Sequence, residues 1–143
     1  MRTWSPKFGK ADARLLVVDD SSDIVELVGT MLSSRGYEVS GVSSGAEALS
    51  VIDVVQPQLV FLDISMPEMD GFDVLTRLRA RPSTEDLPII MLSGHRDEPD
   101  IRRALSLGAK GYVVKPFTVA DLIGRIKQIL AAPKGVQGSL KQT

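Results

Sequence analysis

Acidic, hydroxyl and ammonium side chains occur directly after four short apolar runs of the sequence. In chain order they are Asp19 and Asp20, Asp63, Ser93 and Lys115. Three carboxylates placed close together cannot all stay ionised without a counter-charge. A hard divalent cation such as Mg²⁺ meets that need, because it prefers oxygen ligands and is often shared with a phosphate. The combination therefore predicts a Mg²⁺ site that also accommodates a phosphoryl group.

Asp63 is the candidate nucleophile of this site. Carboxylates can form acyl phosphates, and Asp63 directly follows a strongly apolar run. Phosphoryl transfer requires in-line positioning and neutralisation of the charge on three equatorial oxygens. The ammonium group of Lys115 and the hydroxyl group of Ser93 are suited to contact such oxygens.

The apolar runs predict the strands that carry these residues. Residues 15–18, 59–62 and 89–92 are continuous apolar segments, typical of strands buried on both faces of a parallel sheet. Residues 37–42 alternate between apolar and polar side chains, and residues 111–114 form a short run. Both of these segments are therefore expected at the edges of the sheet.

Between the strands, apolar residues recur at helical spacing with capping residues at the helix ends. The predicted helices lie between Ile24 and Gly36, Ser44 and Val54, Asp70 and Pro82, Pro99 and Gly108, and Thr118 and Pro133. Five strand–helix units predict a doubly wound α/β fold with a five-stranded parallel sheet in the order 2-1-3-4-5. Ligands of such folds bind beyond the carboxyl ends of the strands, where the polar residues named above would converge.

The composition excludes several classes of protein. The 143 residues allow one domain, and the absence of cysteine excludes disulfides, zinc–thiolate sites and thiol nucleophiles. A single histidine excludes a multi-histidine metal site. Residues 15–131 carry 17 acidic and 11 basic side chains, which argues against nucleic-acid binding by this domain. Without a membrane span or a signal peptide in the sequence, we expect a cytoplasmic protein without a membrane partner.

The two ends of the chain differ in composition from the rest. Residues 1–12 are predicted to be a basic N-terminal tail, and residues 132–143 to be a C-terminal tail or the start of a linker. The folded domain is predicted to span residues 13–131.

Together, the residues at the strand ends resemble the receiver domain of two-component response regulators, which has a flavodoxin-like fold. The resemblance covers about residues 13–131. Four pieces carry it by their joint order and spacing: Val17-Val18-Asp19-Asp20, Asp63 to Gly71, Ser93, and Lys115-Pro116-Phe117.

The resemblance implies that the chain is a phosphoryl-accepting signalling switch. Asp63 would accept the phosphoryl group from a phosphohistidine on a histidine kinase or a phosphotransfer protein. Asp20, Asp63 and the backbone carbonyl of Ser65 would ligate Mg²⁺, and Asp19 would act largely through a bound water. The protein would not be a turnover enzyme, because it would only accept a phosphoryl group and slowly lose it.

Further roles follow from the same resemblance. Ser93 would donate a hydrogen bond to one phosphoryl oxygen, and Lys115 would pair with another. Tyr112 matches the switch aromatic of the family, which turns inward when Ser93 is drawn to the phosphoryl group. Ser65 and His95 occupy positions that tune the lifetime of the acyl phosphate.

The resemblance also implies an output surface and leaves alternatives open. Phosphorylation would change the face formed by the fourth helix, fifth strand and fifth helix, through which a homodimer or a downstream protein would bind. A phosphatase of the haloacid-dehalogenase type would need a second aspartate where Ser65 stands, and Asp19-Asp20 would repel a flavin phosphate. The main alternative is a receiver-like interaction module that is never phosphorylated.

Overall fold

The computed structural model describes residues 1–130, so the predicted C-terminal tail at 132–143 lies outside the described residues. The strands are β1 (Arg2–Trp4), β2 (Arg14–Val18), β3 (Glu38–Val42), β4 (Leu59–Leu62), β5 (Ile89–Ser93) and β6 (Gly111–Val114). The helices are α1 (Ser22–Ser33), α2 (Gly45–Val55), α3 (Gly71–Arg79), α4 (Glu98–Ser106) and α5 (Val119–Leu130). The predicted alternation of strands and helices is thus present from β2 to α5.

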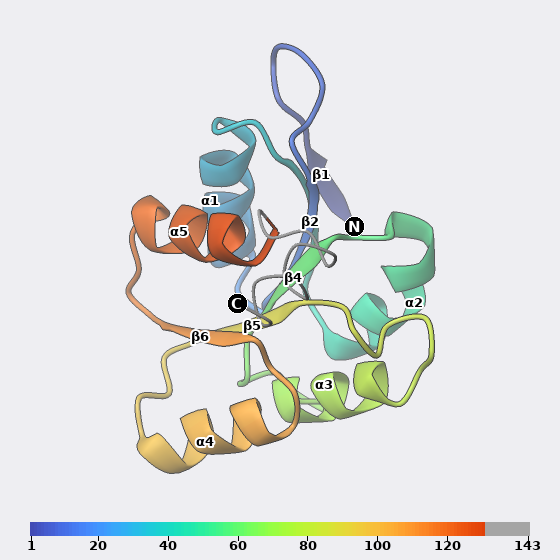
Figure 1. The fold of residues 1–143 in the computed structure, drawn as a ribbon, viewed down its shortest axis with the longest axis vertical. Helices are drawn as coiled ribbons and strands as arrows, with labels where there is room; N and C mark the ends of the chain where they lie inside the picture. Colours follow the sequence, from blue (N-terminus) through green and yellow to red (C-terminus); the bar gives the residue numbers. More distant parts are fainter. Residues whose placement is uncertain (131–143) are drawn as a thin grey trace, which may run out of the picture.

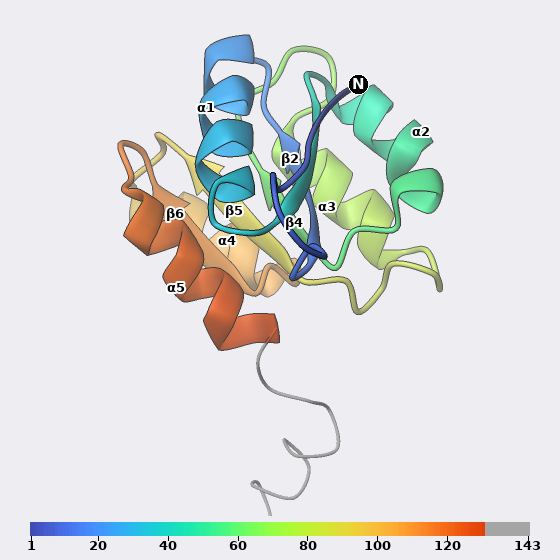
Figure 2. The same cartoon turned by 90° about the horizontal axis from the view of Figure 1, so that it is seen from above.

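All six strands form one sheet in the order β1-β3-β2-β4-β5-β6. Strands β3, β2, β4, β5 and β6 run parallel to one another, which is the predicted order 2-1-3-4-5. Helices α1 and α5 cover one face of the sheet, and α2, α3 and α4 cover the other (Figures 1 and 2). The predicted doubly wound α/β fold is therefore confirmed.

Each face of the sheet packs into its own hydrophobic core. On the side of α1 and α5, the core includes Val28 and Leu122, which pack with Phe61 of the central strand. On the opposite side, Leu75 of α3 packs with Leu62. Because neighbouring residues of a strand point to opposite faces, Phe61 and Leu62 contribute to different cores. This explains why the central strands are apolar throughout their length.

The predicted starts of two helices, α3 and α5, coincide with side-chain caps. Asp70 and Asp73 form a reciprocal capping box at the start of α3. Thr118 and Asp121 make the same reciprocal pair at the start of α5.

The N-terminal segment differs from the prediction. The expectation that residues 1–12 form a tail is wrong for Arg2–Trp4, which pair antiparallel with β3 as β1. The sheet therefore has six strands rather than five, and residues 37–42 do not end it as predicted. The alternating pattern of residues 37–42 resembles an edge strand, but β1 covers the outer side of β3, and every residue of β3 except Glu38 is buried.

The Trp4 side chain explains why this short strand is held on the sheet. A Cβ atom added to Gly29 of α1 would lie only 2.3 Å from the Trp4 ring. A Cβ atom added to Gly41 of β3 would also lie 2.3 Å from an existing side-chain atom. The indole ring thus lies in a notch that the missing side chain of Gly29 makes available. At Gly41 the added atom would meet Val25 first and the Trp4 ring at 3.0 Å.

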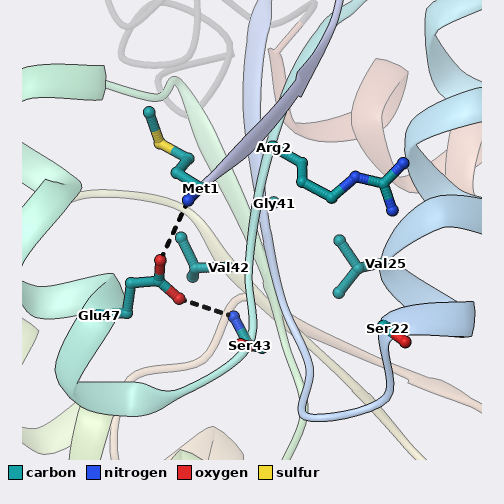
Figure 3. Close-up of a pocket in the computed structure, with 8 residues that line it drawn as sticks. All are labelled: Met1, Arg2, Ser22, Val25, Gly41, Val42, Ser43 and Glu47. Atoms are coloured by element: carbon teal, nitrogen blue, oxygen red, sulfur yellow. Dashed lines mark hydrogen bonds and ion pairs between the residues drawn. The ribbon is translucent and has the colours of Figure 1, made fainter.

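Polar contacts also hold the residues that precede Trp4, and Figure 3 shows the Met1 amino group directed at the Glu47 carboxylate. The amino group of Met1 lies 3.2 Å from the carboxylate of Glu47, which also accepts a hydrogen bond from the Ser43 N–H. The guanidinium group of Arg2 lies 4.9 Å from the centre of the Trp4 ring, within the range of a cation–π contact. Since the Arg2 side chain is exposed, the contact with Trp4 contributes little free energy beyond that of the buried indole surface.

Among the described residues, no helix is both long and apolar enough to cross a membrane.

Candidate functional site

The parallel ladders bring the predicted site residues to the carboxyl edge of the sheet. The Asp63 N–H donates to the carbonyl of Val18 at 2.9 Å, and the Lys115 N–H donates to the carbonyl of Ser93 at 2.8 Å. Each of these bonds extends a strand pairing by one residue. The backbones of Asp63 and Lys115 are thereby fixed by the sheet rather than by a flexible loop.

Lys115 joins two buried carboxylates. Its Nζ atom donates a hydrogen bond to Oδ2 of Asp19 at 2.6 Å and lies 3.6 Å from Oδ1 of Asp63. Asp19 and Asp63 are only 1% and 4% exposed. The structure therefore brings the predicted acceptor, an acidic partner and the predicted lysine into one cluster.

One ammonium group does not fully compensate the buried charge. Burial raises the pKa of the Asp63 carboxyl above its ordinary value, and the negative charge of Asp19 raises it further. The ammonium group of Lys115 and the N–H of Ser65 lower this pKa but do not cancel the rise. An additional positive charge beside Asp63 would favour its ionised form.

The three carboxylates fit a divalent cation. Asp19, Asp20 and Asp63 each offer a carboxylate oxygen, and these three atoms lie within 4.8 Å of one another. Asp20 is exposed, so this side of the cluster is open to water. An oxygen-only donor set that is partly open to water suits Mg²⁺, which keeps several of its waters.

The start of α3 packs directly against the backbone of the predicted acceptor. The N–H of Gly71 donates to the carbonyl of Ile64 at 2.8 Å. A Cβ atom at Gly71 would lie 2.2 Å from the carbonyl oxygen of Asp63, so no larger residue fits here without a backbone shift. Gly71 thus helps to fix Asp63 by allowing the helix to approach closely.

Ser93 and Tyr112 lie on neighbouring strands beside the loop that contains His95. Ser93 is fully buried, and its hydroxyl oxygen accepts a hydrogen bond from the His95 N–H at 3.2 Å. The Tyr112 hydroxyl donates to the His95 carbonyl at 2.7 Å. Burial is the main cause that raises the pKa of Tyr112, so its hydroxyl remains a donor at neutral pH.

His95 also connects this region to Ser65 and to a residue that the sequence reasoning missed. Its Nε2 atom lies 2.5 Å from Oγ of Ser65, and its Nδ1 atom lies 2.7 Å from Oδ2 of Asp100. The sequence signal that could have identified Asp100 is a carboxylate five residues after the histidine, in the first turn of a predicted helix. Acidic residues are common at that position because they favour helix N-termini, so the pattern alone did not single out Asp100.

The comparisons with known proteins agree with this arrangement. The family model described as "Response regulator receiver domain" matches residues 15–127. The transcriptional regulatory protein PrrA of Mycobacterium leprae is 41% identical over 122 residues, which cover 85% of this chain and 52% of that protein.

Solved structures show the same fold. The chemotaxis protein CheY4 of Vibrio cholerae matches with a TM-score of 0.79 and 30% identity, covering 85% of this chain and all of that one. A receiver domain of a signal transduction histidine kinase from Syntrophus aciditrophicus matches with a TM-score of 0.78 and 31% identity, covering 85% of this chain and 92% of that one.

The chain therefore belongs to the response regulator receiver family, and its function is that of a phosphoryl-accepting switch in two-component signalling. Members of this family are in general not turnover enzymes. The chain spans about half the length of the curated relatives that it matches.

Proposed function

We propose that Asp63 is the phosphoryl acceptor of this switch and that a histidine kinase or a histidine phosphotransfer protein is the donor. A carboxylate oxygen of Asp63 attacks phosphorus, and the bond between phosphorus and the donor's imidazole nitrogen breaks. The products are an acyl phosphate on Asp63 and a free imidazole on the donor. The observation that carries the proposal is the buried carboxylate of Asp63, with Lys115 3.6 Å away at the carboxyl edge of the sheet.

The neighbouring residues have distinct parts in this reaction. Asp19, Asp20, Asp63 and the backbone carbonyl of Ser65 would hold Mg²⁺, with Asp19 acting largely through a water. When bound, Mg²⁺ neutralises charge on the transferring phosphoryl group. Lys115 is already held at the site by Asp19 and can pair with a phosphoryl oxygen without a large movement.

The switch is assigned to Ser93 and Tyr112. Ser93 lies beside the acceptor strand, and its hydroxyl group can donate to a phosphoryl oxygen while it still accepts from the His95 N–H. Tyr112 holds the same loop through the His95 carbonyl. A shift of Ser93 toward Asp63 therefore pulls on the backbone segment that Tyr112 contacts.

The output surface is assigned to α4, β6 and α5. Its candidate contact residues are Ile101, Leu105, Tyr112, Phe117 and Lys127. Leu105 is 48% exposed, so its side chain is accessible to a partner. A homodimer or a downstream protein would bind there, and the domain itself would not contact nucleic acid. The chain takes one phosphoryl group and loses it slowly, without catalytic turnover of an external substrate.

Phosphoryl uptake from a small donor tests the acceptor assignment. The protein is incubated with Mg²⁺ and either acetyl phosphate or phosphoramidate, and its intact mass is measured. We expect a gain of one phosphoryl group in the wild type and in Asp53→Asn, an exposed carboxylate of α2, but none in Asp63→Asn. Chelation of Mg²⁺ should also prevent the gain.

Two results would contradict this proposal. Uptake by Asp63→Asn equal to that of the wild type would place the acceptor elsewhere. No uptake by the wild type from either donor would favour the interaction module that is never phosphorylated.

A further inference from the structure

His95 is the hub of a hydrogen-bonded network that connects the acceptor loop to α4. Its ring nitrogens contact Ser65 and Asp100 at 2.5 and 2.7 Å. Its backbone N–H donates to Ser93, and its carbonyl accepts from Tyr112. One residue therefore contacts both switch residues, the residue two positions after the acceptor, and the first turn of the output helix.

The chemistry of the three side chains determines where the protons lie. The carboxylate of Asp100 can only accept a hydrogen bond, so Nδ1 of His95 carries the proton. In the neutral ring, Nε2 is then an acceptor, and the Ser65 hydroxyl donates to it. Asp100 thus selects the tautomer of His95, and this tautomer sets the direction of the Ser65 hydroxyl group.

The hydrogen-bonded chain Asp100–His95–Ser65 attaches α4, a helix that buries little of its own surface. Ala104 is the one fully buried residue of α4. The N-cap residue Asp97 makes no hydrogen bond from its side chain, so the usual cap of the first turn is missing. The contact of Asp100 with His95 therefore supplies a specific attachment for this end of α4.

We propose that Asp100 is a positioning residue that acts through His95 to hold the loop after β5 against Ser65. We name the chain Asp100–His95–Ser65 the clasp. In the closed clasp, the two loops beside Asp63 are joined, which restricts the access of water and small phosphoryl donors to the acceptor. The proposal rests on the assignment of Asp63 as the acceptor, and the clasp controls how rapidly the phosphoryl group enters and leaves.

Nuclear magnetic resonance reads the clasp without any phosphorylation. His95 is the single histidine of the chain, so ¹⁵N-labelled histidine gives the signals of this ring alone. We expect a protonated Nδ1 and an unprotonated Nε2 in the wild type. Asp100→Asn should shift the ring toward the other tautomer, because an asparagine side chain can also donate to Nδ1.

Glu98→Gln is the matched control for this experiment. It removes one negative charge from the same first turn of α4, but Glu98 pairs with Arg102 and not with His95. The ring signals of Glu98→Gln should equal those of the wild type. A wild-type ring protonated on Nε2 alone, or ring signals that Asp100→Asn leaves unchanged, would overturn the proposal.

The kinetic test measures uptake from acetyl phosphate and the subsequent loss of the phosphoryl group by intact mass. We expect Asp100→Asn to accelerate both processes about fivefold, the size of a typical coupling between residues in one network. Ser65→Ala should have a similar effect. In the Ser65→Ala background, Asp100→Asn should change the rates less than twofold, because the clasp is already open.

The double variant separates the clasp from a general effect on α4. Equal acceleration by Asp100→Asn with and without Ser65 would show that Asp100 acts independently of Ser65 and would overturn the clasp. Failure of the wild type to take up a phosphoryl group would instead refute Asp63 as the acceptor. The tautomer measurement would still report on the clasp in that case.

Discussion

Two parts of the sheet are stabilised in opposite ways. One is the carboxyl edge that holds Asp63, here called the acceptor edge, and the other is the outer edge formed by β1, here called the N-terminal edge. At the acceptor edge, Asp19 and Asp63 are buried with one ammonium group between them, and the pKa of Asp63 is raised. At the N-terminal edge, the Trp4 ring packs against Gly29 and Gly41. The first arrangement retains buried charge at a cost in stability, and the second adds apolar contact.

This difference shows how the fold separates stability from reactivity. A charged cluster can be kept ready for chemistry only if other regions supply the free energy of folding that it costs. The contacts of Trp4 lie outside the cluster formed by Asp19, Asp63 and Lys115. Substitutions around Trp4 should therefore lower stability with little effect on phosphoryl transfer, and substitutions in the charged cluster should impair phosphoryl transfer without destabilising the protein.

The largest effect on stability is expected for Trp4→Ala. The substitution removes the indole ring from its notch and leaves β1 without an apolar anchor. We expect a loss of about 2–3 kcal/mol in the free energy of unfolding, somewhat below the usual cost for a fully buried tryptophan, because Trp4 is half-buried. Urea denaturation measures this loss, and phosphoryl uptake by the folded variant should equal that of the wild type.

Arg2→Ala provides the matched control in the same strand. The exposed contact of Arg2 with the Trp4 ring should contribute only about 0.5 kcal/mol. If Arg2→Ala destabilised the protein as much as Trp4→Ala, the edge would depend on charge, and the contrast between the two regions would fail.

A smaller effect, and one that changes sign, is expected for Gly29→Ala. In the presence of Trp4, the added methyl group would overlap the indole ring, and we expect a cost of about 1–2 kcal/mol. In the Trp4→Ala background, the same substitution should stabilise the protein by about 0.5–1 kcal/mol, since alanine is favoured over glycine inside a helix. A cost of equal size in both backgrounds would show that Gly29 is required for a reason other than Trp4.

An effect smaller than those of Trp4→Ala and Gly29→Ala is expected for Asp63→Asn in a buffer with a chelator. The amide has a similar shape but no charge to bury, so we expect a gain in stability on the order of 1 kcal/mol at neutral pH. Denaturant unfolding of both proteins across a range of pH measures this difference. The exposed Asp53→Asn should change stability by less than about 0.5 kcal/mol at every pH.

The direction of the pH dependence follows from the raised pKa of Asp63. Its ordinary value is 3.8, so above this pH the folded protein binds more protons than the unfolded chain until the raised pKa is passed. The stability that protonated Asp63 contributes is fully present below pH 3.8 and is lost as the pH rises through the raised pKa. The advantage of Asp63→Asn should therefore shrink on acidification, and a pH-independent difference would contradict the cause given for the pKa shift.

Most of the fold could be predicted because its signals are local. The apolar runs at 15–18 and 59–62 indicate buried strands by themselves, and Asp70 with Asp73 marks a helix start within four residues. β1 could not be predicted in this way. It has three residues, too few to show alternation, and its anchor depends on Gly29 and Gly41, which are far away in the sequence.

The candidate site shows the same limit. Asp19, Asp63 and Lys115 could be predicted as neighbours because parallel strands bring their carboxyl ends to one edge. Their roles in phosphoryl transfer stay predictions until uptake is measured. Asp100 was missed because its contact with His95 depends on the path of an irregular loop, which no periodic pattern encodes.

The outer edge of a β-sheet offers unpaired N–H and C=O groups to any extended chain that approaches it. Without β1, the five residues of β3 would present such a row, and their valines would favour pairing between molecules. β1 closes this row with three residues, of which Arg2 and Thr3 are exposed and polar. Because β1 is shorter than β3 and its exposed residues are polar, we expect variants that release β1 to self-associate more readily than the wild type.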